Sequence, residues 1–172
     1  MPRDAVPMSA PLAGPVCKPD PPEGCRIRAL VAADILSLGV LMSEAFAGTV
    51  DDDGSLLDDH VQVASRTMAG QFGPVRGDAT LAAVAPGDPD DLVGAVVVTV
   101  WADLPLLAFA LVRPSWQRRG LGRALLARSA NALRAAGETR WTLSVTRHNP
   151  AVHLYERFGF REDQSLVRRT RR

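Results

Sequence analysis

The sequence predicts one α/β domain in which a mixed, mostly antiparallel central sheet is flanked by helices. Strand-length apolar runs alternate with longer runs that carry apolar residues at helical spacing, in the order β-α-α-β-β-β-α-β-α-β. Short connections join the three consecutive strands, which favours antiparallel hairpins. A helix separates the fourth strand from the fifth, which implies a parallel crossover at that point.

Each expected element follows from its apolar pattern and from the glycine or proline that ends it. The expected strands cover residues 26–30, 80–85, 92–101, 104–112 and 141–146, with a final strand or tail from residue 160. The expected helices cover residues 32–47, 56–68, 120–136 and 149–158.

The two ends of the chain differ from the domain between them. Residues 1–24 hold seven of the 13 prolines and few large apolar residues, so we predict a flexible N-terminal tail. Residues 25–166 form the expected folded domain. Residues 167–172 contain four arginines and are predicted to be a basic, solubilising C-terminal tail.

Length and composition exclude several classes of protein. A chain of 172 residues is long enough for a core of its own, and its net charge of +1 gives no general attraction for nucleic acid. No apolar run reaches the ~18 residues of a membrane span. The two cysteines, Cys17 and Cys25, match no zinc or redox spacing, and the N-terminus lacks a signal-peptide core. We therefore expect a cytoplasmic protein with free thiols and no metal.

The most informative segment joins the fourth strand to the third helix, over residues 117–123. Glycines at the start of a helix let successive backbone N–H groups approach a ligand closely. The first N–H groups of a helix have no intrahelical partner and lie at the positive end of its dipole. The segment therefore predicts a phosphate or pyrophosphate site. The alternative interpretation is a tight turn with solvated arginines.

Three phosphate-binding motifs compete for this segment. A P-loop requires Gly-Lys-Ser/Thr, which is absent, and a dinucleotide fingerprint would have a small residue where Leu125 stands. The third motif is Gln/Arg-x-x-Gly-x-Gly/Ala, and residues 117–122, Gln-Arg-Arg-Gly-Leu-Gly, agree with it at every defined position. The segment thus resembles the loop with which the GCN5-related N-acetyltransferase family binds the pyrophosphate of acyl-CoA.

A second segment strengthens the resemblance. Residues 149–160 contain Asn149, Leu154-Tyr155 and Gly159-Phe160, and they are similar to the segment that closes the acyl-CoA site in the same family. The two segments occur in the order and at the separation typical of the family. The likeness covers roughly residues 26–166 and implies the acyl-CoA N-acyltransferase fold.

The resemblance implies a role for named residues. Tyr155 would be the general acid that protonates the departing thiolate, because a phenol with an ordinary pKa near 10 is protonated at neutral pH; the alternative is a buried aromatic filler. Relatives often have the coenzyme-contacting Asn one residue earlier, so His148 shares that candidacy with Asn149. The predicted acetyl-CoA contacts are Ala110, Leu111, Val112, Gln117, Arg118, Arg119, Gly120, Leu121, Gly122, Arg123 and Asn149.

The family also implies a bulge in the fourth strand and a gap between the fourth and fifth strands. Pantetheine would lie in that gap, a bulge N–H would face the thioester carbonyl, and an amine would attack directly. The general base is not identified, because the strand over residues 104–112 has no carboxylate. The remaining candidates are Glu44, Asp51–Asp53, His60, Asp103, His148 and His153.

The acceptor is the least defined part of the prediction. In such proteins the first two helices and their loop wall the acceptor site, and the run Asp51–Asp53 there would attract a cationic amine. The alternative is a solvated turn that caps the second helix. A non-catalytic acyl-CoA-binding sensor or assembly module is the rival function. A nucleic-acid binder would need stacking residues among its arginines, and Trp116 alone qualifies. The acyl preference and the oligomeric state, a homodimer included, stay open.

Overall fold

The computed structural model describes residues 5–14 and 19–169. Residues 1–4, 15–18 and 170–172, and with them Cys17 and parts of both predicted tails, lie outside the described residues. The strands are β1 Ala5–Pro11, β2 Arg26–Ala29, β3 Leu81–Val84, β4 Leu92–Trp101, β5 Leu104–Val112, β6 Arg140–Thr146 and β7 Arg161–Glu162. The helices are α1 Ile35–Phe46, α2 Leu57–Met68, α3 Leu121–Ala135, α4 Val152–Arg157 and α5 Ser165–Arg169, with 3-10 turns at Ala32–Asp34 and Pro114–Trp116.

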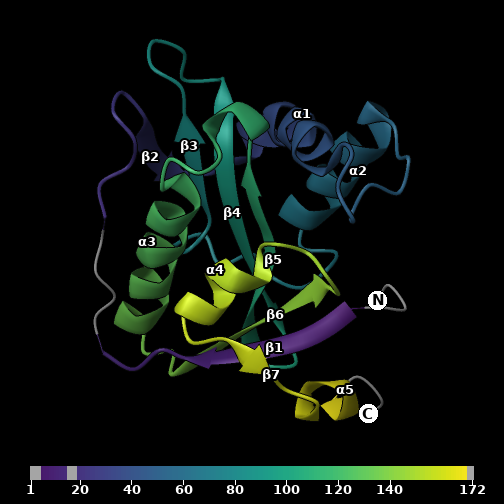
Figure 1. Ribbon diagram of the computed structural model, residues 1–172, viewed down its shortest axis with the longest axis vertical. Coiled ribbons are helices and arrows are strands. Elements are labelled where there is room, and N and C mark those ends of the chain that lie inside the picture. Colours follow the sequence, from purple (N-terminus) through teal and green to yellow (C-terminus); the bar gives the residue numbers. More distant parts are fainter. Residues whose placement is uncertain (1–4, 15–18, 170–172) are drawn as a thin grey trace.

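The strands form one sheet in the order β2-β3-β4-β5-β6-β1-β7 (Figure 1). Every neighbouring pair is antiparallel except β5 and β6, which run parallel because α3 makes the crossover between them. The predicted mixed, mostly antiparallel sheet is confirmed. The predicted elements between residues 26 and 158 are also confirmed, with bounds that differ by a few residues.

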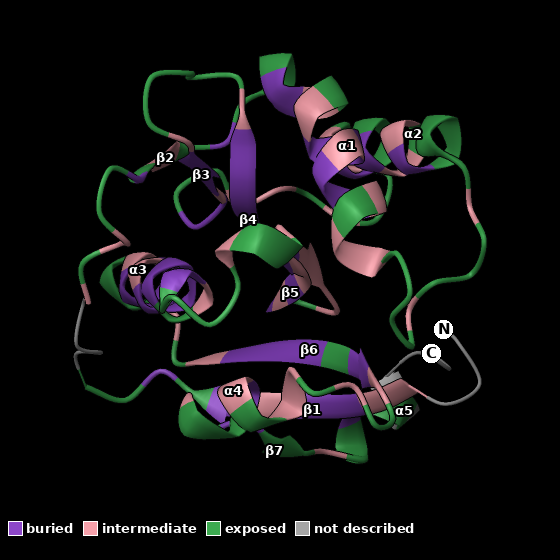
Figure 2. Cartoon of the chain, turned by 45° about the horizontal axis from the view of Figure 1, so that its top comes forward, coloured by how far each residue is buried: buried purple, intermediate pink, exposed green. Residues whose placement is uncertain are grey.

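Helices cover both faces of the sheet, and each face has its own core. Figure 2 shows the buried strand β4 between α3 on one side and α1 with α2 on the other. On the first face, Leu125 and Leu133 of α3 pack against Val96 and Val98 of β4. On the second face, Leu38, Leu41 and Met42 of α1 and Ala64 of α2 pack against Val97 and Leu111. Because both faces of β4 are buried, its sequence is a nearly continuous apolar run.

The N-terminal segment corrects one prediction. Residues 5–11, placed by composition in a flexible tail, form β1 and pair with β6 along the whole strand, from Ala5↔Thr146 to Pro11↔Arg140. Met8 and Ala10 are buried in the core beside α3. The proline content of residues 1–24 had suggested a tail, but Pro7 lies within this strand and Pro11 ends it, and the alternating side chains of Val6, Met8 and Ala10 pack on the core.

Candidate functional site

The strands β5 and β6 separate at the centre of the sheet. They pair only at Leu106↔Thr142 and Leu107↔Leu143. The register between β4 and β5 shifts at the same point, from Val98↔Leu107 to Val97↔Phe109, so Ala108 is a bulged residue. The bulge and the gap that the family resemblance implied are therefore both present.

The burial of β6 marks where the gap begins. Thr142 is 2% exposed, and its hydroxyl donates to the Pro105 carbonyl oxygen at 3.1 Å. Ser144, two residues further along the same face, is exposed, although it lies on an interior strand. On β5, residues 108–110 and 112 are only half-buried. The gap thus opens beyond Leu107 and widens toward the ends of both strands.

The register of β5 determines which backbone groups face the gap. The Arg113 N–H donates to the Val93 carbonyl at 2.9 Å, and Val112 pairs with Gly94. Because successive residues of a strand direct their N–H and C=O groups to opposite sides, Leu111 bonds toward β4, whereas Ala110 and Val112 face the gap. Leu111 is 3% exposed and packs in the core beside α1. Among the three predicted contacts on β5, Ala110 and Val112 therefore direct backbone groups toward the gap, although the Val112 carbonyl already accepts a hydrogen bond from Gln117 Nε2.

The glycine loop leads from the end of β5 into α3. Its first intrahelical bond runs from the Ala124 N–H to the Gly120 carbonyl at 3.0 Å. Among the described residues, the N–H groups of residues 118–123 have no backbone partner. Arg118 and Gly120 both have positive φ, 60° and 86°. Left-handed residues just before a helix are a feature of backbone concavities that bind anions. The loop thus presents a series of free donors at the positive end of a 15-residue helix.

Some side chains around this loop already have partners within the protein, and others are free to contact a ligand. Arg113 donates to Glu44 and to Asp91, both at 2.7 Å, so its charge is already paired. The Arg119 guanidinium lies over the Trp116 ring, 5.3 Å from its centroid. Gln117 Nε2 donates to the Val112 carbonyl at 3.1 Å and holds the loop against β5. Arg118 and Arg123 are exposed and form no ion pair within the described residues. These two, together with Arg119, which has no carboxylate partner in the described residues either, are the cations available to a diphosphate.

Helix α4 lies close to this loop. A Cβ at residue 122 would be in van der Waals contact with Leu154 Cδ2 at 3.4 Å and with Val112 Cγ2 at 3.6 Å. The first turn of α3, the end of β5 and α4 therefore meet at one point. Tyr155, next to Leu154, packs edge-on against Phe160, with ring centroids 6.0 Å apart.

Tyr155 combines burial with an unused hydroxyl. It is 8% exposed, and its hydroxyl has no hydrogen-bond partner among the described residues. Burial, together with the negative charge of Asp51, raises the pKa of Tyr155 to about 12. The phenol is therefore neutral at every physiological pH and keeps its proton to donate.

Asn149 links this helix to the loop between α1 and α2. Its Nδ2 donates to Asp51 Oδ2 at 2.6 Å, and its Oδ1 accepts the Ala151 N–H at 2.8 Å. The second bond forms an Asx turn ahead of α4, which begins at Val152, three residues after the expected start. Both ends of the Asn149 amide are thus engaged within the protein, and its contact with a coenzyme stays a prediction.

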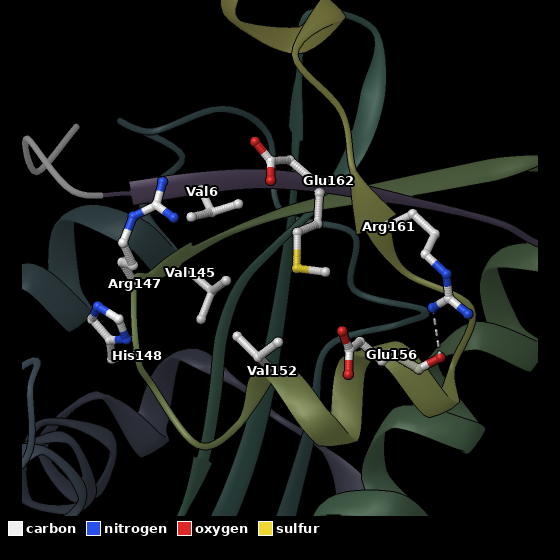
Figure 3. Close-up of a pocket in the computed structure, with 9 residues that line it drawn as sticks. Val6, Val145, Arg147, His148, Val152, Glu156, Arg161 and Glu162 are labelled. Atoms are coloured by element: carbon white, nitrogen blue, oxygen red, sulfur yellow. Dashed lines mark hydrogen bonds between the residues drawn. The ribbon is translucent and has the colours of Figure 1, made fainter.

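His148, the alternative to Asn149, lies in a different environment. It is exposed, has a φ of 69° and lines a pocket of about 240 Å³. Figure 3 shows this pocket between α4 and β1, with Arg147 and His148 at one end and Arg161 at the other, where Arg161 donates to the Glu156 carbonyl at 3.1 Å. Its lining comes from β1, β6, α4, β7 and the segment after β6, and includes no residue of β5 or α3. The pocket is therefore separate from the gap.

The structure also separates the candidate bases. Glu44 is paired with Arg113, and His153 is exposed 3.6 Å from Glu156. His60 is 9% exposed, with its ring 5.9 Å from that of Phe46. Asp103 lies in the turn between β4 and β5. Asp51 differs from all of these, because it contacts the segment that carries Tyr155. The contact between Asp51 and Asn149 joins residues 98 positions apart, so periodicity and motif spacing could not predict it.

Within residues 5–14 and 19–169, no group of three or more His, Cys, Asp or Glu side chains is arranged to hold a metal ion. None of the helices in this part of the chain has the length and apolar character that crossing a bilayer requires. Cys25 is free and buried, and burial raises its pKa.

Comparison with known proteins identifies the same region. The model of the acetyltransferase (GNAT) domain matches residues 78–162, which include β5, the glycine loop and α4. A streptothricin acetyltransferase from Streptomyces lavendulae is 36% identical over 80 residues, which are 45% of this chain and 42% of that enzyme.

Solved structures extend the likeness to nearly the whole chain. A GCN5-related N-acetyltransferase from Sphaerobacter thermophilus matches with a TM-score of 0.72 and 25% identity over 92% of this chain and 48% of that one. A PaiA N-acetyltransferase from Thermoplasma acidophilum, solved with coenzyme A, shares the fold, with a TM-score of 0.58 and 17% identity over 78% of this chain and 87% of that one. The chain spans less than half the length of the first two relatives. On the strength of its domain, its sheet with a central gap and its glycine loop, the chain belongs to the GCN5-related N-acetyltransferase family.

Proposed function

We propose that this protein is an N-acetyltransferase that moves an acetyl group from acetyl-CoA to a primary amine by direct attack in a ternary complex. One observation carries the proposal: β5 and β6 part beyond Leu107, and the free N–H groups of the glycine loop lie where β5 leads into α3, close to the helix α4 that carries Tyr155. A coenzyme in this gap would have its diphosphate at one end and its thioester near the phenol at the other.

The residues present fit acetyl-CoA. The free N–H groups of Gly120, Leu121 and Gly122 would bind the diphosphate, with Arg118 and Arg123 adding charge. The backbone groups of Ala110 and the N–H of Val112 would bond the pantetheine amides as a neighbouring strand would. Gln117 and Arg119 flank the same loop, and Leu111 supports the strand from the core below.

The chemistry follows from two groups of the chain. A backbone N–H at the Ala108 bulge would stabilise the negative charge that develops on the thioester oxygen; removing such a donor costs about 10²–10³-fold in rate in other enzymes. Tyr155 would donate its proton to the departing sulfur, which its raised pKa allows because the phenol stays protonated. No cysteine lies in the part of the chain that forms the gap, which agrees with direct attack.

A second candidate is an acyl-CoA-binding sensor or assembly module without turnover. The absence of any carboxylate from β5 and β6 favours it, since relatives often carry the base there. Under either proposal the compartment is the cytoplasm, as the cysteine usage predicts.

Two measurements separate the candidates. Acetyl-CoA should raise the melting temperature of the protein, whereas ADP or ATP should raise it much less, because they lack the pantetheine that the gap accommodates. Thiol release is then measured with spermidine, kanamycin, streptothricin and a lysine-containing peptide. Release above the rate without amine supports the enzyme. Binding without any release supports the sensor, and no binding rejects both.

A further inference from the structure

We infer that Asp51 receives the acceptor: its carboxylate holds the ammonium group of a cationic amine beside Tyr155 and takes the proton that the amine loses before attack. The inference rests on the proposed acetyl transfer, and it assigns both the acceptor class and the base that the strands do not supply. It depends on three observations, namely the different uses of three neighbouring aspartates, the contact of Asp51 with Asn149, and the unpartnered hydroxyl of Tyr155.

The three aspartates of the loop between α1 and α2 have different partners. Asp52 accepts the N–H groups of Gly48 at 2.7 Å and of Gly54 at 3.0 Å. Asp53 accepts the Ser55 N–H at 3.0 Å. These hydrogen bonds lower the pKa of both carboxyl groups. Asp52 and Asp53 thus hold the loop in shape and are exposed, as in the solvated turn of the alternative interpretation, but the N-terminus of α2 is capped by Asp59 and not by them.

Asp51 alone reaches another part of the molecule. Its Oδ2 accepts a hydrogen bond from Asn149 Nδ2 at 2.6 Å, and Asn149 lies in the segment just before α4. Its Oδ1 has no partner, and its carboxylate forms no ion pair, within the described residues. Asp51 is half-buried, unlike the exposed Asp52 and Asp53. Asn149 therefore positions a carboxylate that still has one oxygen free.

Asp51 also acts on the segment that carries Tyr155. Its partner Asn149 forms the turn that leads into α4, on which Tyr155 lies, and the negative charge of Asp51 adds to burial in raising the pKa of Tyr155. Tyr155 is itself more than nine-tenths buried and has no hydrogen-bond partner in the described chain. An amine held by Asp51 would thus face the thioester whose sulfur Tyr155 protonates.

The proton balance of the step is complete with these two residues. The ammonium gives one proton to Asp51, and the free amine attacks the thioester carbon, so that a C–N bond forms and the C–S bond breaks. Tyr155 gives its proton to the sulfur and regains one from the nitrogen of the new amide. Asp51 later releases its proton to water. Acetyl-CoA and an ammonium thus yield an amide, a thiol and one proton.

The test compares three proteins: wild type, Asp51→Asn and Asp53→Asn. Asn at position 51 keeps an oxygen for Asn149, and Asn at position 53 keeps the oxygen that Ser55 uses, so each change removes a charge and little else. Acetyl-CoA affinity is measured first for each protein, followed by kcat/KM for thiol release with spermidine, kanamycin, streptothricin and a lysine-containing peptide.

We expect equal acetyl-CoA affinity in all three proteins. With the best amine, Asp51→Asn should lose about 100-fold or more in kcat/KM, whereas Asp53→Asn should stay within about twofold. Equal losses in the two variants would overturn the inference. So would a wild-type protein that binds acetyl-CoA but releases no thiol with any of these amines. A wild-type protein that does not bind acetyl-CoA would instead reject the proposed function.

Discussion

The glycine loop, residues 117–123, and the acidic loop, residues 47–56, are both exposed and charged, but they use their polar groups in opposite ways. In the glycine loop the backbone donors of residues 118–123 are free. In the acidic loop the donors of Gly48, Gly54 and Ser55 are bound by side chains of the same loop. The first loop therefore leaves its backbone donors available to a ligand, whereas the second uses its own side chains to fix the loop that carries Asp51.

This difference explains why the glycine loop could be predicted from the sequence, whereas the contact of Asp51 with Asn149 could not. A backbone anion site needs glycine at fixed positions before a helix, and such spacing is visible in a single sequence. A side-chain site assembled across the fold depends on where two distant loops meet. The Asp51–Asn149 contact joins residues 98 positions apart, and no local pattern predicts it.

The largest effect on catalysis is expected from a substitution of Tyr155. Tyr155→Phe should lower kcat roughly 10²-fold or more, because it removes the proposed proton donor, and should leave acetyl-CoA affinity nearly unchanged. The ring that packs against Phe160 is retained, so the folded structure should persist. Steady-state thiol release and calorimetric binding give the two values. A kcat within about threefold of wild type would leave Tyr155 with a packing role alone.

A smaller effect is expected at Gly120, which tests the glycine loop by itself. Gly120→Ala introduces a Cβ at a φ of 86° and strains the loop by about 1–2 kcal/mol, which should weaken acetyl-CoA binding about tenfold. Gly137, at the other end of α3, has a φ of 90° and equally open surroundings. Gly137→Ala should therefore cost similar stability and leave binding unchanged. If both variants bind acetyl-CoA as wild type does, the conformation of the glycine loop is not what binds it.

The smallest effect concerns ionisation of the only tyrosine in the chain. Its ultraviolet titration should have a midpoint near pH 12, because burial and the charge of Asp51 raise its pKa. Since the unfolded chain releases this proton near pH 10, the corresponding stability is present below pH 10 and lost as the pH rises from about 10 to 12. Asp51→Asn should lower the midpoint, and Asp53→Asn should not. Identical midpoints in both variants would place Asp51 away from the phenol.

Most of the fold could be predicted from the sequence, because its elements have local apolar patterns. The part that was missed depends on long-range strand pairing. The strands around β4 have continuous apolar runs because both faces of the sheet are covered, and α3 has a clear apolar stripe. The strand β1 was missed because its prolines suggested a tail, although Met8 and Ala10 face the core. Its place between β6 and β7 depends on long-range pairing that a local pattern does not encode.

The central claim is that free N–H groups at the start of α3 bind the diphosphate of the coenzyme. The most direct measurement is an amide NMR titration of the ¹⁵N-labelled protein with coenzyme A. We predict that the amides of Gly120, Leu121 and Gly122 show the largest shifts and become protected from exchange with solvent, since they gain hydrogen bonds. Saturable binding that leaves these three amides unshifted and unprotected would contradict the account.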